Sequence, residues 1–177
     1  MSDALLLNEH WCQSYVGIAI NERLREQYGY HDDAFVTFET SVAWIEKYTA
    51  ARRRGRKPGN LTDRQRFEIL VWSKGGVPAG IVEVKDDPVM QAYFCQADPK
   101  KLEAALKRWA EIRWGIFLFS VRPRLSVTNP KCRLRLAEKR DKVFHHAAMA
   151  VQCNTLEKAS REVPDEPLMW CGMGFGR

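Results

Sequence analysis

Residues 66–85, RFEILVWSKGGVPAGIVEVK, decide how the middle of this chain folds. Two runs within it, Phe67–Trp72 and Ile81–Lys85, are short, apolar and rich in β-branched and aromatic residues, which is typical of strands. The connection Ser73–Pro78 includes two glycines and a proline, the residue types that form tight turns. The stretch therefore predicts a β-hairpin.

The second strand of this hairpin carries opposite charges in an apolar setting. Side chains at i and i+2 of a strand share a face, so Glu83 and Lys85 point the same way. Glu68 on the first strand approaches Glu83 if the hairpin pairs in register. Two converging carboxylates repel each other, and Mg²⁺ or Mn²⁺ relieves that repulsion. A lysine beside such a metal can hold an attacking water or balance charge on a phosphoryl group, which suits phosphodiester hydrolysis.

A helix and a strand are expected before the hairpin. The helix runs from Asn8 to about Tyr28, and Gly29 is its stop signal. Its apolar stripe is predicted to consist of Trp11, Tyr15, Ile18 and Glu22, which recur at helical spacing. The strand covers Phe35–Val42, with Tyr48 as its furthest possible end.

Further elements are expected after the hairpin. Asp98-Pro99 is a typical helix opening and predicts a helix to about Arg113, ended by Gly115. Ile116–Val121 is a continuous apolar run of the length of a buried strand. A long final helix is expected over Ala137 to about Ser160, with its start left open. The apolar, glycine-broken tail after Leu168 either packs as a terminal arm or contacts another chain.

Composition bounds the class of protein. The chain has 177 residues, which suits one domain, and its net charge of +6 favours a polyanion such as nucleic acid, with an acidic protein surface second. Its five cysteines form no C-x-x-C pair, which is typical of reduced thiols in the cytoplasm. The apolar run Ala4–Leu7 is too short for a signal peptide or a membrane span. We expect a cytoplasmic protein, associated with the nucleoid when bound to DNA.

A basic, Gly- and Pro-punctuated loop precedes the hairpin. Such a loop lies in water or on a partner, and its charges suffice for several phosphate contacts. The candidate nucleic-acid-binding residues are Arg52, Arg53, Arg54, Arg56, Lys57 and Arg64.

The order of these elements resembles the PD-(D/E)XK, or restriction-endonuclease-like, nuclease superfamily. The resemblance spans roughly Asn8 to Val121 and is carried by the segments Arg66–Val71 and Ile81–Lys85. It implies an α/β fold in α-β-β-β-α-β order, with a central mixed sheet of about four to five strands flanked by helices. The whole chain would be a single domain, with a nuclease-like core at about 8–121 and an extension and arm at about 122–177.

The resemblance also implies roles for single residues. Glu68 and Glu83 would bind Mg²⁺ or Mn²⁺, and Lys85 would be the catalytic lysine. Glu22 would be the glutamate that the first helix often adds, with Glu9 as the fallback. The implied activity is metal-dependent hydrolysis of DNA in repair, recombination, defence or a mobile element. A homodimer would allow both strands to be cut.

Two departures from the family pattern keep other functions open. Glu68 stands where aspartate is commoner, which favours an inactive nuclease-fold module that binds DNA or a protein. Asp86-Asp87 after the lysine either assists the metal or turns the chain. A third possibility is an assembly factor that uses the arm from Leu168 to Phe175 to bind a protein partner.

Several candidate residues have plainer interpretations. Glu22 can pair with Arg25 on an exposed helix face, since such pairs are common at i,i+3. Glu39 suits a structural or solvent-facing strand position. His145 and His146 point about 100° apart on a helix, so we treat them as helix-face residues.

Overall fold

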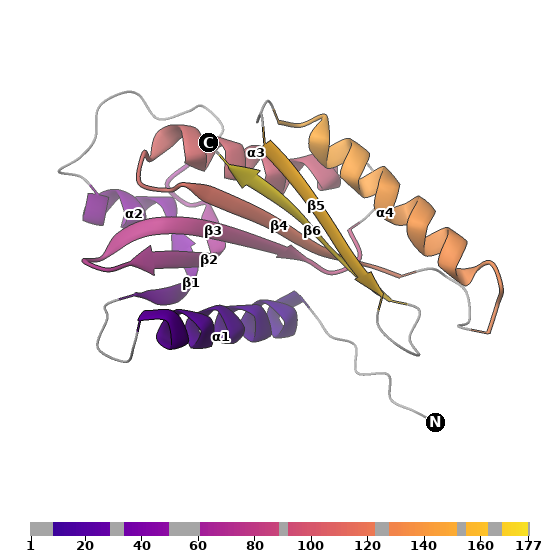
Figure 1. Ribbon diagram of the computed structural model, residues 1–177. Coiled ribbons are helices and arrows are strands. Elements are labelled where there is room, and N and C mark those ends of the chain that lie inside the picture. Colours follow the sequence, from indigo (N-terminus) through magenta and orange to yellow (C-terminus); the bar gives the residue numbers. More distant parts are fainter. Residues whose placement is uncertain are drawn as a thin grey trace.

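The computed structural model describes residues 9–28, 34–49, 61–88, 92–122, 128–151, 155–162 and 168–176. Within these residues the chain is an α/β fold with one mixed sheet of six strands in the order β1-β2-β3-β4-β6-β5 (Figure 1). The strands are β1 (Phe35–Ser41), β2 (Arg66–Ser73), β3 (Val77–Lys85), β4 (Trp114–Val121), β5 (Thr155–Glu162) and β6 (Met169–Gly176). The sheet exceeds the predicted four to five strands because the C-terminal part of the chain contributes β5 and β6.

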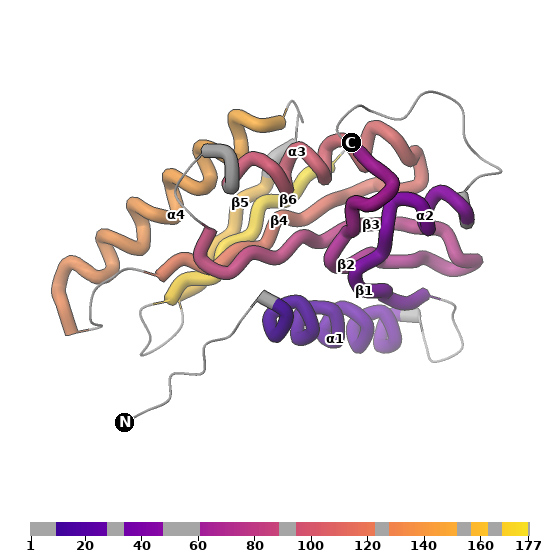
Figure 2. Tube along the Cα trace, turned by 180° about the vertical axis from the view of Figure 1, so that it is seen from behind, coloured from indigo at the N-terminus to yellow at the C-terminus, as the bar shows by residue number. Residues whose placement is uncertain are grey.

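Helices lie on both faces of the sheet. They are α1 (Glu9–Tyr28), α2 (Val42–Thr49), α3 (Ala92–Arg108) and α4 (Cys132–Ala148). α1 covers one face of β1 to β3, and the other three helices lie on the opposite side (Figures 1 and 2). The main core on that side includes Phe67, Leu70, Trp72, Ile81, Leu102, Phe117, Phe119 and Phe144. A smaller apolar cluster under α1 is built on Cys12, Ile69, Val82 and Val84.

The predicted hairpin is confirmed. β2 and β3 pair antiparallel with Ile69 opposite Val82, and β1 pairs antiparallel with β2. β4 is the predicted buried strand and runs parallel to β3. Parallel neighbours need a crossover connection, and α3 provides it.

Gly80 of β3 lies against Trp114 of β4, and a larger residue has no room there. A Cβ on Gly80 would lie 2.2 Å from the ring atoms Cε2 and Cζ2 of Trp114. We expect Gly80→Ala to lower the free energy of unfolding by about 1–3 kcal/mol, because the ring must shift within a packed region. Urea denaturation measures this. The control is Gly172→Ala, whose Cβ would have its nearest neighbour 3.9 Å away; equal stability of the two variants would contradict the steric argument.

The bounds of α1 agree with the prediction, but its predicted buried stripe is wrong. Trp11, Tyr15 and Ile18 are exposed. The helix approaches β1 so closely that a Cβ on Gly17 would lie 2.2 Å from Phe38 Cε1, so the contact requires glycine at this position. An apolar pocket of about 410 Å³ beside the helix is lined by Trp11, Cys12, Tyr15, Val16, Leu118 and Trp170.

β1 ends earlier than its furthest predicted limit. The side chain of Ser41 accepts a hydrogen bond of 3.2 Å from the backbone N–H of Trp44, as an N-cap residue does. The chain therefore turns into α2 at Val42 instead of continuing as a strand to Tyr48.

The predicted start and end of α3 are wrong. The helix begins at Ala92, so Asp98 and Pro99 lie inside it, and it ends at Arg108. Proline in a helix interior removes one hydrogen bond and crowds the preceding turn, whereas the buried Asp98 makes ion pairs to two lysines at this position. Gly115 lies within β4 and does not end the helix.

The C-terminal third differs most from its prediction. α4 ends at Ala148, and residues 155–162 form the edge strand β5. The charged side chains of β5 are typical of an exposed sheet edge as well as of a helix. The tail, predicted to pack as a terminal arm or to contact another chain, is β6, a strand hydrogen-bonded between β4 and β5. No helix among the described residues is long and apolar enough to cross a membrane.

Candidate functional site

The hairpin brings its two glutamates together where β2 separates from β3. The last paired residues are Ile69 and Val82, which place Glu68 next to Glu83. Beyond that pair the backbone N–H of Val84 donates a 2.6 Å hydrogen bond to Glu68 Oε2. The Glu68 carboxylate thus takes the place of a strand partner and is held against β3.

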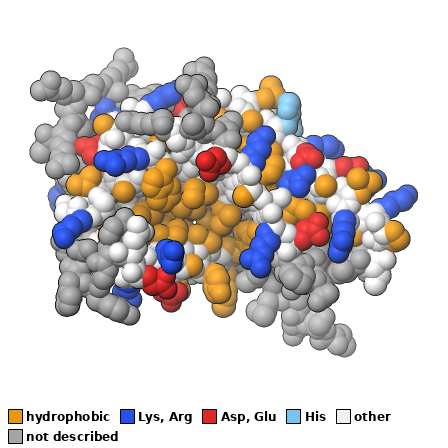
Figure 3. All heavy atoms as spheres, in the orientation of Figure 1, with side chains coloured by type: hydrophobic (Ala, Val, Ile, Leu, Met, Phe, Trp, Pro, Cys, Tyr) orange, Lys and Arg blue, Asp and Glu red, His pale blue; other side chains and the backbone are white. Residues whose placement is uncertain are grey.

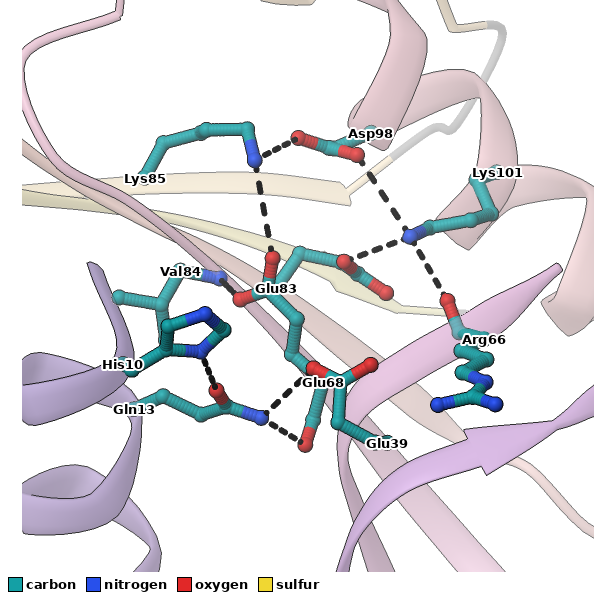
Figure 4. A network of polar contacts seen from close by, with 10 residues as sticks. All are labelled: His10, Gln13, Glu39, Arg66, Glu68, Glu83, Val84, Lys85, Asp98 and Lys101. Carbon is teal, nitrogen blue, oxygen red and sulfur yellow. Dashed lines mark hydrogen bonds and ion pairs between the residues drawn. The ribbon is translucent and has the colours of Figure 1, made fainter.

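Lys85 points to the same cluster, as the alternation of the strand predicts. Its Nζ lies 3.7 Å from Glu68 Oε1 and 3.9 Å from Asp98 Oδ2 of α3. Figure 4 shows Lys85 entering the group of carboxylates from one side and Lys101 from the other. With 32% of its side chain exposed, Lys85 is the most accessible of these charged groups and can meet a ligand from solvent.

Glu83 is the most deeply buried charged residue of the site. It is 0% exposed, and its Oε2 accepts a 2.7 Å hydrogen bond from Lys101 Nζ. Its Oε1 has no hydrogen-bond partner among the described residues. Lys101 also lies 3.6 Å from Asp98 Oδ1, so α3 supplies one acid and one base to the cluster.

Burial controls the protonation of this pair. Desolvation raises the pKa of Glu83 well above its usual value; Lys101 offsets this in part, whereas Asp98 and Glu68 add to it. Desolvation acts to lower the pKa of Lys101, but the charges of Glu83 and Asp98 outweigh it and the pKa rises. The ammonium group therefore remains charged at neutral pH.

The raised pKa of Glu83 predicts a pH-dependent stability. At a pH between the pKa of Glu83 in the unfolded chain and its higher pKa in the folded protein, the folded protein binds more protons. The contribution of Glu83 to stability is therefore fully present below the unfolded-state pKa and is lost as the pH rises through the folded-state pKa. The stability of wild type minus that of Glu83→Gln should fall with rising pH, by at most about 1.4 kcal/mol per unit. Urea denaturation in chelator over a pH series checks this. A constant difference would contradict it.

α1 contributes a glutamine to the other side of the cluster. Gln13 Nε2 donates to the backbone oxygen of Glu68 at 2.8 Å and to Glu39 Oε1 at 3.1 Å. His10 Nδ1 lies 3.3 Å from Gln13 Oε1. Glu39 has a left-handed backbone with φ of 49°, an uncommon conformation for a residue other than glycine. Gln13 thus links β1 and β2 beside the cluster of carboxylates.

The structure does not bring Glu22 into this cluster. Glu22 is exposed and follows Gln13 by nine residues, or about 14 Å along the helix axis. The fallback Glu9 is the first residue of α1. The contribution of α1 to the site is therefore Gln13, and the expectation for Glu22 is corrected because its helix face turns toward solvent.

Asp86 and Asp87 turn the chain and tie three elements together. Asp86 Oδ1 accepts a 2.5 Å hydrogen bond from the Ser120 hydroxyl, and Asp87 Oδ1 accepts one of 3.0 Å from the backbone N–H of Arg122. Lys139 of α4 donates to Asp87 as well. Of their two predicted roles, this geometry favours the turn.

Of the predicted nucleic-acid-binding residues, Arg64 alone lies within the described residues. Arg52, Arg53, Arg54, Arg56 and Lys57 lie outside the described residues, and Arg64 is exposed in the turn before β2. Figure 3 shows Lys and Arg side chains around a central apolar area and toward the end where α4 lies. The side chains of Arg133 and Arg135 on α4 are among the exposed ones.

Three residues of the cluster were missed by the sequence analysis. Asp98 and Lys101 are three residues apart, a spacing that puts them on one helix face, but Asp98 was interpreted as a cap. Gln13 belongs to a second helical stripe with Val16 and Ile20, which competed with the bulkier stripe chosen.

The donor atoms of the cluster suit a hard divalent cation, which prefers carboxylate oxygens. Glu83 Oε1, buried and without a hydrogen-bond partner, is a candidate ligand atom. In the part of the chain that the structure describes, however, no three His, Cys, Asp or Glu side chains are arranged to hold a metal ion. Lysine ammonium groups lie between the carboxylates.

Comparison of the chain with family models, curated proteins and solved structures finds no match.

Proposed function

We propose that this protein is a metal-dependent nuclease that hydrolyses DNA and has a restriction-endonuclease-like core. The observation that carries the proposal is the meeting of Glu68, Glu83, Asp98 and Lys85 at the separated ends of β2 and β3. The antiparallel β1-β2-β3 unit, followed by α3 and by β4 parallel to β3, supports it. The resemblance implies the order α-β-β-β-α-β, and the observed order from α1 to β4 differs from it by the short helix α2 between β1 and β2.

Glu83 and Glu68 would hold Mg²⁺ or Mn²⁺. When bound, the metal supplies a Lewis acid and a water of lowered pKa. Lys85, held by Glu68 and Asp98 and partly exposed, keeps a positive charge where negative charge develops on a phosphoryl oxygen. Gln13 fixes the backbone of Glu68, so that β2 keeps its carboxylate on β3. The net charge of +6 supports binding to the DNA backbone.

The wild-type protein tests this proposal directly. Linear, nicked, branched and single-stranded DNA, and an RNA of matched sequence, are incubated with Mg²⁺, with Mn²⁺ and with chelator. We expect cleavage of at least one DNA that requires metal and stops in chelator. The DNA that is cut fastest identifies the substrate class, and size-exclusion chromatography with that DNA tests for a homodimer.

A second candidate is a nuclease-fold module that binds DNA or a protein without catalysis. The ion pair that covers the buried Glu83 favours it, because Lys101 already neutralises that carboxylate. This module would bind DNA equally well in metal and in chelator and would cleave nothing. β6 is paired on both sides within its own sheet, which disfavours a partner bound through the C-terminal tail.

A further inference from the structure

The ammonium group of Lys101 is surrounded by oxygen atoms from three elements. It donates hydrogen bonds to Glu83 Oε2 of β3 at 2.7 Å and to the backbone oxygen of Arg66 of β2 at 3.0 Å. Asp98 Oδ1 of α3 lies 3.6 Å away, and the Phe67 ring centroid is at 5.6 Å. Only 14% of the Lys101 side chain is exposed.

Two carboxylates and a backbone carbonyl form the kind of oxygen set that hard divalent cations bind. Two further carboxylate oxygens of these residues accept no hydrogen bond from the lysine. Glu83 Oε1 and Asp98 Oδ2 are buried and have no hydrogen-bond partner among the described residues. An unused oxygen on a fully buried glutamate is costly unless a further cation or donor reaches it.

We propose that Lys101 is an internal cation that occupies the metal position of this site, and that Mg²⁺ or Mn²⁺ must displace it from Glu83 to bind. This inference rests on the proposed function, because it assumes that the Glu83 cluster is a metal site. Two cations on one buried carboxylate repel each other strongly at low effective dielectric constant. The lysine can yield, since its ammonium group stands on a flexible four-carbon stem.

The arrangement also accounts for the spacing of the carboxylates. Lys101 lies between Glu83 and Asp98 and pairs with both. Each carboxylate therefore faces the ammonium group and not the other carboxylate. Withdrawal of Lys101 would leave Glu83, Asp98 and the Arg66 carbonyl around one shared position. Asp98 would therefore join Glu83 as a metal ligand once Lys101 has withdrawn.

Mn²⁺ binding tests this inference without any measurement of cleavage. Titration calorimetry is carried out on wild type, Lys101→Met and the matched control Lys100→Met, the exposed neighbouring lysine on α3. We expect Lys101→Met to bind Mn²⁺ at least about tenfold more tightly than wild type. An effect of this size is within the usual range of interaction energies between groups in contact. Lys100→Met should bind as wild type does.

The loss of Lys101 leaves Glu83 buried without its partner, so folding is followed in the same samples. Mn²⁺ should raise the melting temperature of Lys101→Met more than that of wild type, because the ligand binds only the folded state. Lys101→Gln retains an amide donor for Glu83. It should also bind Mn²⁺ more tightly than wild type, and it replaces Lys101→Met in the test if that variant unfolds. The double variant Lys101→Met/Glu83→Gln removes both charges and should lose the tight binding.

The outcomes separate this inference from the proposed function. Equal or weaker Mn²⁺ binding by Lys101→Met and Lys101→Gln, with binding lost in Glu83→Gln, would overturn the role of Lys101 and leave the metal site standing. Absence of Mn²⁺ binding in wild type and in both Lys101 variants would overturn the inference together with the metal-dependent function.

Discussion

Replacing Glu83 with glutamine should reduce metal-dependent DNA cleavage by about a thousandfold or more. Glutamine has nearly the same shape, so the hydrogen bond from Lys101 can be kept while the negative charge is removed. A neutral amide binds a hard divalent cation poorly, and a bound metal stabilises the transition state by several kcal/mol, with each 1.36 kcal/mol worth about a factor of ten. Single-turnover cleavage of the best DNA substrate at saturating Mn²⁺ measures the loss.

The matched control for this variant is Glu103→Gln, which changes a different largely buried glutamate, one that lies on α3. Glu103 pairs with Lys107 at 3.1 Å and is not among the residues assigned to the metal, so its variant should cleave at the wild-type rate. Similar losses in both variants would indicate damage to folding. Wild-type cleavage by Glu83→Gln would refute the assignment of Glu83 as a metal ligand.

Replacing Lys85 with methionine should lower the rate constant of cleavage by about a hundredfold to a thousandfold, the usual cost of removing one group that stabilises transition-state charge. Methionine keeps most of the length of the side chain and loses the ammonium group near Glu68 and Asp98. Affinity for DNA should change little, because Lys85 acts on the charge that develops during the reaction. Single-turnover rates and DNA binding are measured on the same samples.

Lys74→Met in the turn between β2 and β3 is the control, since it removes an exposed lysine from the same hairpin. It should match wild type in both rate and binding. A Lys85→Met variant that loses DNA affinity but keeps its maximal rate would make Lys85 a binding residue. Wild type and all variants that bind DNA but cleave nothing would favour the non-catalytic module.

The local pattern predicted the centre of the fold correctly. The alternation and turn residues of 66–85 depend on neighbours in sequence, so the hairpin and the shared face of Glu83 and Lys85 follow from backbone geometry alone. The apolar run of β4 was equally clear, because a short continuous apolar run is typical of a strand with other elements packed on both faces; in β4 one face is buried and the other is partly buried.

Other elements were decided by contacts that are distant in sequence. Two helical stripes competed on α1, and the close approach of Gly17 to Phe38 goes with the stripe of Gln13, Val16 and Ile20 facing the sheet. Residues 155–162 contain good helix formers, yet pairing with β6 makes them a strand. Asp98 resembles a helix cap in sequence, and its ion pairs with Lys85 and Lys101 exist only once α3 packs on the sheet.

The sequence by itself determined the hairpin, the positions of Glu68, Glu83 and Lys85 on it, and the basic character of the chain. Only the tertiary structure decided which further groups meet them: Gln13 from α1 and the acid–base pair Asp98 and Lys101 from α3. Strand alternation is a local property of the backbone, whereas the packing of helices on a sheet depends on the shape of surfaces far apart in sequence. For that reason the sequence could locate one side of the site, and the fold alone could complete it.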